Sequence, residues 1–185
     1  MSIPRRNTTH DLSTIMIRLR VAGKIWAMTG GTPATVRLDK ARVAYTLHPY
    51  SHDDRADSYG EEAAAALGVD PRRIFKTLIA SVDGRLVCAV VPVAGKVNLK
   101  ALAAAAKGKK AEMAEPAKAQ RATGYVVGGI SPLGHKTRIS VIIDSTAADL
   151  DTIYVSAGKR GLQVELSPED LVGLTGGRFA PIAAS

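Results

Sequence analysis

From residue 32 onward, the hydrophobic pattern divides the chain into short strand-like runs and short helical stripes. Two apolar runs, residues 74–82 and 86–92, are separated only by a loop at Asp83-Gly84. Asp-Gly between two strand-like runs is a strong signal for a β-hairpin, because both residues tolerate the positive φ angles of its turn. Shorter runs predict further strands at residues 43–48, 140–144 and 152–155.

Helix-start signals separate these runs. A helix often begins after a Ser, Thr or Asn that caps its first N–H groups, and proline is favoured at the first helical position. This pattern predicts helices at residues 33–42, 59–67, 99–107, 116–122 and 168–174. Short helices among mixed strands predict an α+β (mixed α/β) fold with a largely mixed or antiparallel sheet, in one domain over residues 32–185.

Residues 1–31 differ from the rest of the chain. They contain five Arg and Lys residues against one acid, Asp11. Two interpretations fit an Arg-rich, acid-poor leader: an organelle transit peptide, or an over-extended start in front of a true start at Met28. We favour the second, and we assign residues 1–31 to an N-terminal extension, disordered or over-extended, outside the fold.

The composition fits a domain with an aliphatic core and a basic surface. The 185 residues are 46% hydrophobic and 4% aromatic, so Val, Ile, Leu and Ala must fill the core. No apolar run is long enough to cross a bilayer, and no membrane partner is expected. The single cysteine, Cys88, allows no internal disulfide and fits a reducing cytoplasm. The net charge of +8 favours a polyanionic partner such as nucleic acid.

Common signatures of catalysis and metal binding are missing. The histidines, at positions 10, 48, 52 and 135, form no metal-ligand spacing with Cys88 or with carboxylates. No Ser-His-Asp order and no glycine-rich nucleotide fingerprint is present either. The sequence therefore predicts neither a metal nor a cofactor.

Residues 124–136 form the most informative segment. An apolar, strand-like run ends in the pair Gly128-Gly129, and the chain then continues to His135 and Lys136. Because glycine has no Cβ, such a pair lets a ligand approach the backbone and can turn N–H groups toward an oxyanion or a phosphate. An ordinary tight turn is the alternative interpretation.

Lys76 is unusual because it lies in an apolar strand. It shares a strand face with Ile74, Leu78 and Ala80. A lysine on such a face either lines a cleft, where it can hold a phosphate or a carbonyl oxygen, or protects an edge strand from aggregation. The sequence leaves both interpretations open.

The segment 156–161 carries two adjacent cations. Gly158 and Gly161 bracket Lys159 and Arg160, an arrangement that suits either a phosphate or a solvated hairpin turn. Between residues 96 and 138, nine Lys and Arg residues face only two acids, Glu112 and Glu115. This basic stripe favours a polyanion as the partner.

Five segments resemble, in the same order, those of the YbaK/EbsC-type aminoacyl-tRNA deacylases. They are residues 75–78, 91–95, 112–114, 124–134 and 154–165. The resemblance covers residues 32–183 and is strongest to the Cys-tRNA(Pro) deacylases of the YbaK type. It implies a YbaK-like domain with a mixed, partly barrel-like sheet flanked by short helices, a fold shared with the editing domain of bacterial prolyl-tRNA synthetases.

The resemblance implies hydrolysis, in trans, of the ester that joins a wrong amino acid to tRNA. The expected substrate is tRNA(Pro) carrying cysteine, with the cysteine thiol as nucleophile and prolyl-tRNA synthetase as a further partner in a ternary complex. This reaction would proofread the synthetase, because a pocket for proline rejects the similarly sized cysteine poorly. Two alternatives stay open: a deacylase for tRNA carrying alanine or serine, and a non-catalytic module that binds tRNA or the synthetase.

The resemblance also assigns residues to a catalytic group. Lys76 matches the lysine that would orient the 3′-terminal adenosine or its phosphate. Gly128 and Gly129 match the glycine pair whose backbone would line the aminoacyl pocket. Lys159 and Arg160, within the matched segment 154–165, are assigned to substrate binding.

Four further residues complete the predicted pocket. Tyr50 and Tyr59 stand where the family has aromatic pocket residues, although the YbaK type has phenylalanine at the second position. Ser156 matches a pocket serine, followed by Ala157 where the family has glycine. Gln163 replaces an aspartate of the YbaK type, which leaves the amino-acid specificity open.

Overall fold

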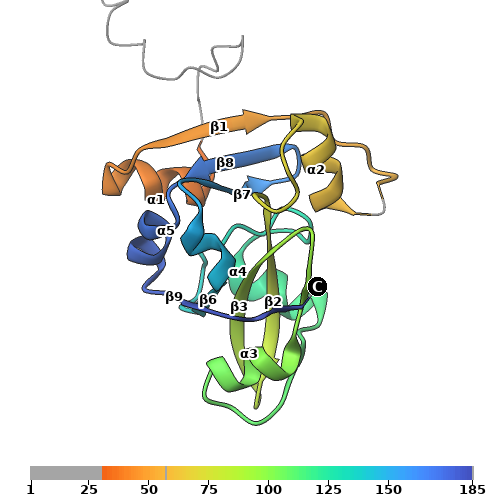
Figure 1. Ribbon diagram of the computed structural model, residues 1–185, viewed down its shortest axis with the longest axis vertical. Helices are drawn as coiled ribbons and strands as arrows, with labels where there is room; N and C mark the ends of the chain where they lie inside the picture. Colours follow the sequence, from red (N-terminus) through yellow and green to blue (C-terminus); the bar gives the residue numbers. More distant parts are fainter. Residues whose placement is uncertain (1–30, 57, 185) are drawn as a thin grey trace, which may run out of the picture.

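Strand β2 (Phe75–Val82) links the two main sheets, and the rest of the fold is arranged around it (Figure 1). The computed structural model describes residues 31–56 and 58–184, so the predicted extension at 1–31 lies, except for Gly31, outside the described residues. The other strands are β1 (Tyr45–Pro49), β3 (Arg85–Pro92), β4 (Lys96–Val97), β5 (Ala111–Met113), β6 (Ser140–Asp144), β7 (Ile153–Lys159), β8 (Leu162–Leu166), β9 (Arg178–Ala180) and β10 (Ala183–Ala184). The helices are α1 (Pro33–Ala41), α2 (Tyr59–Leu67), α3 (Leu99–Ala105), α4 (Pro116–Thr123), the 3-10 helix η2 (Ser145–Asp149) and α5 (Pro168–Thr175). None of these helices has the length and apolar character that a membrane span requires.

The two main sheets differ in pairing. The first has the strand order β5-β2-β3-β6-β9, with antiparallel pairs around β2 and parallel pairs around β6. The second, β1-β8-β7, is antiparallel throughout. A parallel bridge between Ile74 and Tyr154 joins the sheets at the start of β2. The predicted α+β fold with mixed pairing is confirmed.

Local signals account for the predicted elements. The loop between β2 and β3 has positive φ at both central residues, 48° at Asp83 and 84° at Gly84, as a tight hairpin turn requires. The predicted caps also form. Thr32, Ser58 and Asn98 accept a hydrogen bond from the N–H three residues on, which starts α1, α2 and α3.

One part of the predicted pattern is wrong, and another is incomplete. Residues 124–127 are not a strand: Gly124 ends α4 at φ 79°, and the chain enters a turn. The predicted strand at 152–155 continues to Lys159, past a bulge between Ser156 and Lys159, and pairs with β8, which was not predicted. An apolar run becomes a strand only where a partner pairs with it: β7 has β8, whereas residues 124–127 pair with none of the described strands.

Side chains alternate along β2, so the strand contributes to the core on both faces. Phe75 and Ile79 belong to the largest apolar cluster, which lies between the two sheets. Ala80 and Val82 belong to a second cluster with Leu102 of α3, on the opposite face. The strand is thus buried on both sides, which fixes its position in the fold.

One buried carboxylate fixes the C-terminal segment. Asp144 is 2% exposed, and its Oδ1 accepts hydrogen bonds from the N–H groups of Ile182 and Ala183 at 2.9 and 2.7 Å. Its Oδ2 accepts from the N–H and the hydroxyl of Thr146 at 3.1 and 2.6 Å. Burial alone would raise the pKa of Asp144, but these four bonds outweigh it and lower the pKa.

We expect Asp144→Asn to lower the free energy of unfolding by about 2–3 kcal/mol at neutral pH, because an amide has one acceptor oxygen and leaves one pair of donors unsatisfied. A depressed folded-state pKa stabilises the protein above the unfolded pKa and loses that effect as the pH falls through the folded pKa. The deficit should therefore shrink below about pH 4. Urea denaturation between neutral and acid pH measures it, with the exposed Asp149→Asn as control. A deficit that stays constant with pH would contradict this account.

Candidate functional site

A pocket of about 350 Å³ opens along β2 where the strand passes from one sheet to the other. The bridge to β7 ends at Ile74, and β5 pairs with β2 only from Ala80 onward. Between these two contacts, no strand of the described residues covers this edge of β2. Residues 75–79 therefore form one wall of the pocket, and α2, α4, β7, β8 and the turn after α4 supply the others.

The uncovered edge turns main-chain groups into the pocket. Ile79 O accepts from Ala114 N on the pocket side, whereas Ile74 O accepts from Val93 N on the β3 side. Backbone groups alternate in direction along a strand, so the N–H and C=O of Thr77 face the same side as those of Ile79. A strand edge of this kind offers hydrogen bonds to an extended or planar ligand.

Lys76 lies in the same wall and lines the pocket. Its Nζ donates a hydrogen bond to Gly95 O at 2.7 Å, and the side chain is half-buried. Burial lowers the pKa of Lys76, and this shift is opposed by the carboxylate of Glu61 and assisted by the charge of Lys96. The ammonium has two further N–H donors available for a ligand.

We call residues 124–130 the glycine loop. Gly128 has a φ of +87°, and a Cβ at this position would lie 2.8 Å from the Tyr59 ring. A Cβ at Gly129 would lie 3.0 Å from the backbone of Lys159 and Arg160. Gly128 lines the pocket together with Tyr59, while Gly129 is buried behind it against the β7–β8 turn. The pair is therefore required for two close approaches, one to a ring and one to a backbone.

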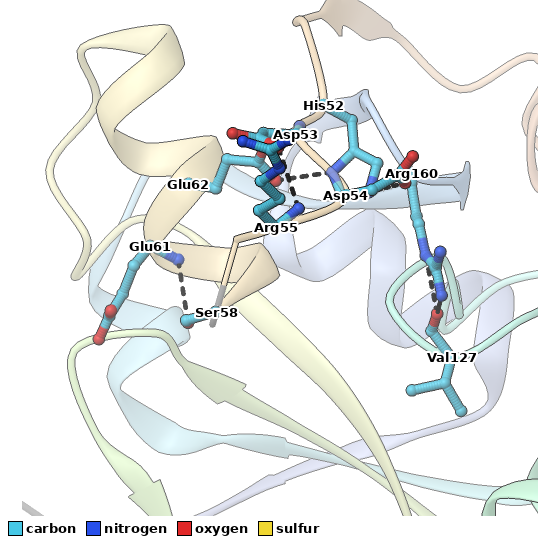
Figure 2. A network of polar contacts seen from close by, with 9 residues as sticks. All are labelled: His52, Asp53, Asp54, Arg55, Ser58, Glu61, Glu62, Val127 and Arg160. Carbon is cyan, nitrogen blue, oxygen red and sulfur yellow. Dashed lines mark hydrogen bonds and ion pairs between the residues drawn. The ribbon is translucent and has the colours of Figure 1, made fainter.

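Arg160 holds the glycine loop in place. Its guanidinium donates two hydrogen bonds to Val127 O, at 3.1 and 2.8 Å (Figure 2). It also lies over the Tyr59 ring, 4.9 Å from the centroid. Such a contact between a cation and an aromatic face is favourable. From the other side, Gln120 Oε1 accepts from Val127 N at 3.0 Å. Neither interaction has a recognisable sequence signal, since Arg160 lies 33 residues from Val127 and the contact of Gln120 with Val127 fits no local motif.

A second network fixes the entry to α2, which begins at Tyr59. Glu62 accepts hydrogen bonds from His52 at 2.8 Å and from Asp53 N at 2.5 Å (Figure 2). Burial alone would raise the pKa of Glu62, but these two bonds outweigh it and lower the pKa. The His52 ring lies 5.6 Å from the Tyr59 ring. Tyr59 is thus held by the contacts of Arg160 and His52.

Two buried polar atoms in the pocket lack a partner. Thr77 Oγ1 and Gln163 Oε1 have no hydrogen-bond partner among the described residues, and both side chains line the pocket. Ser156 also lines it, and its hydroxyl accepts from Gly158 N at 3.2 Å. Unsatisfied buried polar atoms are rare in folded proteins and point to a ligand that supplies the missing partner.

The remaining predicted residues lie outside the pocket lining. Tyr50 packs beside α2 and donates its N–H to Gly161 O at 2.9 Å, and burial raises the pKa of its hydroxyl. Lys159 is exposed at the β7–β8 turn. Cys88 is fully buried in β3, and burial raises the pKa of its thiol. Residues 31–56 and 58–184 contain no cluster of His, Cys and carboxylate side chains that could hold a metal ion.

The comparison with protein families decides the affiliation. Residues 53–174, which include the glycine loop, β2 and the β7–β8 hairpin, match the family described as "Aminoacyl-tRNA editing domain". The chain belongs to this family. The predicted resemblance to YbaK/EbsC-type deacylases is confirmed by this match together with the relatives described next.

Individual relatives share this editing domain. The Enterococcus faecalis protein named "Putative Cys-tRNA(Pro)/Cys-tRNA(Cys) deacylase EbsC" is 38% identical over 153 residues, which cover 82% of this chain and 92% of that protein. A proline–tRNA ligase from Geobacillus kaustophilus is 27% identical over 100 residues, covering 54% of this chain and 18% of the ligase. The crystal structure of "a putative trans-editing enzyme for prolyl tRNA synthetase" superposes with a TM-score of 0.71 at 20% identity, over 84% of this chain and all of that one.

We expect Gly128→Ala to destabilise the editing domain more than Gly84→Ala. The two glycines have nearly the same φ, +87° and +84°, but an alanine Cβ at position 84 meets nothing within 4 Å. Both changes should cost about 1–2 kcal/mol through the left-handed backbone. Gly128→Ala should cost about 1–3 kcal/mol more, because it displaces the Tyr59 ring. Urea denaturation measures both, and equal losses would show that the contact with Tyr59 imposes no constraint.

Proposed function

We propose that this protein hydrolyses mischarged Cys-tRNA(Pro) in trans and so corrects errors of prolyl-tRNA synthetase. As a member of its family it is an aminoacyl-tRNA editing protein, and this membership supports deacylation of mischarged tRNA as its reaction. The observation that carries the proposal is the pocket on the open edge of β2, where the backbone of Thr77, the ammonium of Lys76 and two unpartnered oxygens meet. These groups suit a small polar ester at the end of an anionic chain.

The pocket supplies donors and acceptors, but among the described residues no base activates one of its Ser or Thr hydroxyl groups. Ser58 caps α2, and Ser156 accepts from Gly158 N. The hydroxyl of Thr77 has no partner that could remove its proton. The thiol of the substrate's cysteine is therefore the best nucleophile at hand, since a free thiol is a few per cent ionised at neutral pH and intrinsically reactive.

The proposed step closes a ring within the substrate. The cysteine sulfur attacks the ester carbonyl carbon, the bond from that carbon to the ribose oxygen breaks, and the thiol proton ends on the released ribose hydroxyl. Water then opens the resulting thiolactone to free cysteine. The Thr77 N–H lies on the pocket side of β2, where it can stabilise the oxyanion that develops on the carbonyl oxygen.

The remaining residues position the substrate. Lys76 binds the terminal adenosine or its phosphate with the N–H donors that Gly95 does not use. Tyr59 forms the flat wall beside Gly128. The α-ammonium of the amino acid supplies the donors that Gln163 Oε1 and Thr77 Oγ1 lack. Lys159 contributes charge at the mouth, and Tyr50 supports α2.

A deacylation panel over Cys-, Ala-, Ser- and Pro-tRNA(Pro) tests the proposal. We expect rapid release of cysteine only, because the other three amino acids have no thiol. Lys76→Ala should lower kcat/KM by about 100-fold. The control is Lys100→Ala, which removes an exposed lysine of α3 and so measures the effect of losing one surface charge alone. Rapid hydrolysis of Ala- or Ser-tRNA(Pro) would contradict the thiol mechanism and would support the alternative, a deacylase for tRNA that carries alanine or serine. Binding of tRNA without any cleavage would indicate a non-catalytic module.

Gln163 gives a separate prediction for amino-acid recognition. Gln163→Met keeps the volume but removes the unpartnered oxygen, so the free energy of unfolding should stay equal or rise. The same change should lower kcat/KM for Cys-tRNA(Pro) by about 10-fold, since the α-ammonium loses an acceptor. Urea denaturation and steady-state kinetics on one preparation separate the two effects. Unchanged kinetics would remove Gln163 from the recognition of the substrate.

A further inference from the structure

Apolar side chains that a folded domain normally buries are exposed at the mouth of the pocket. Met113, Val126 and Val127 expose 47%, 54% and 37% of their surface, and we call them the apolar rim. Met113 and Val127 also line the pocket. Among the described residues, Val36 is the one other large hydrophobic residue with comparable exposure. Single exposed apolar residues are common, but a group at the entrance of a pocket marks a binding surface.

The backbone of the glycine loop keeps the rim in this position. The N–H of Val127 is bound by Gln120 and its C=O by Arg160, so the two polar groups of this residue are used within the protein. The neighbouring Tyr125 is buried, and its hydroxyl donates to Leu133 O at 2.7 Å. Figure 2 shows the Val127 side chain pointing away from the guanidinium. The valines are therefore fixed outward and cannot fold back onto the core.

Cations lie beside the rim. The exposed Lys159 is the last residue of β7, and its backbone packs against Gly129. The exposed Lys118 lies on α4 between Pro116 and Ala119, which line the pocket. Glu112, next to Met113, is paired with Lys110 at 3.4 Å. A partner for this surface needs apolar faces for the rim and negative charge for the two lysines. Single-stranded nucleic acid has both, because each flat base is attached to a phosphate.

We propose that the apolar rim receives the unpaired nucleobases at the 3′ end of the tRNA, first of all the base of the terminal adenosine. This inference rests on the proposed function, because the ester that enters the pocket is attached to that adenosine. The base packs on Met113 and Val126, while the phosphates reach Lys118 and Lys159. Contact through apolar faces tolerates any base, so the rim holds the end of the RNA without reading its sequence.

Binding of uncharged RNA tests the rim independently of catalysis. The probe is a fluorescent acceptor-stem hairpin with a single-stranded 3′ end, in an intact form and in a form with abasic terminal nucleotides. Fluorescence anisotropy gives Kd for each form. For the unaltered protein we expect the abasic form to bind about 5- to 10-fold more weakly, as for the loss of one base contact.

A double variant, Met113→Ser/Val126→Ser, removes the apolar rim and is measured with the same two hairpins. It should bind the intact hairpin about 5- to 10-fold more weakly and the abasic hairpin as the unaltered protein does. The dependence of Kd on salt should stay the same, because no charge changes. Val36→Ser, an equally exposed valine on α1, is the matched control and should bind both hairpins normally. Urea denaturation confirms that each variant is folded, since exposed substitutions change stability little.

Two results would overturn the inference. One is an equal loss of affinity for both hairpins in the double variant, and the other is unchanged affinity for both. If the double variant binds RNA normally but loses binding to purified prolyl-tRNA synthetase, the rim contacts a protein instead. Failure of the proposed function gives a different pattern: no ester cleavage, but binding that still depends on the terminal bases and on the rim.

Discussion

The structure depends on one edge of β2, which contacts β7 at the start of the strand and pairs with β5 at its end. Ile74 bridges to β7 before the strand begins, and Ala80 starts the pairing with β5, so the edge between them has no neighbour among the described strands. An unpaired strand edge inside a domain is costly, because its N–H and C=O groups must find water or a ligand. Burial of Phe75 and Val82 on opposite faces holds the strand against that cost. The same pairing that joins the two sheets therefore creates the pocket.

The wall opposite β2 is built from long-range contacts. The glycine loop has no secondary structure of its own, and its shape comes from Gln120 on one side and Arg160 on the other. Tyr59 fits between the loop and Arg160 because Gly128 has no side chain. The guanidinium that seemed available for phosphate is thus engaged with the protein itself. The net charge of +8 does not show which cations are free for a partner: Lys159 and Arg160 are both exposed, but the guanidinium of Arg160 is bound to Val127 O.

Local sequence signals predicted much of the fold and part of the site. The Asp83-Gly84 hairpin and the capped helix starts depend on residues a few positions apart, so the sequence alone identifies them. Residues 124–127 resemble a strand because three of the four are apolar. In the structure they form a turn in which Val126 and Val127 are exposed and not part of the core. β8 was not predicted, although its apolar residues Leu162, Val164 and Leu166 alternate with two polar ones; a bulge such as the one in β7 after Ser156 has no local signal. Lys76 and Gly128, which the sequence singles out, line the pocket, whereas Gln120 and His52 act through contacts that no local motif reveals.

The unpartnered polar atoms of the pocket, on Thr77 and Gln163, belong to uncharged side chains, which limits how strongly the pocket can select an amino acid. A carboxylate at position 163 would hold an α-ammonium through a charge-assisted hydrogen bond, which is about twice as strong as one from a neutral amide. Gln163 and Thr77 offer only neutral acceptors, so a bound α-ammonium would be held less tightly here than by a carboxylate. With weak discrimination in the ground state, selection has to come from the reaction. A substrate that carries its own thiol meets this requirement, because an amino acid of similar size without a thiol can bind and still not react. Under the proposed function, the neutral Gln163 and the lack of an activated hydroxyl among the described pocket residues therefore support the same division of roles: the pocket would position the ester, and the amino acid's own thiol would decide whether it is cleaved.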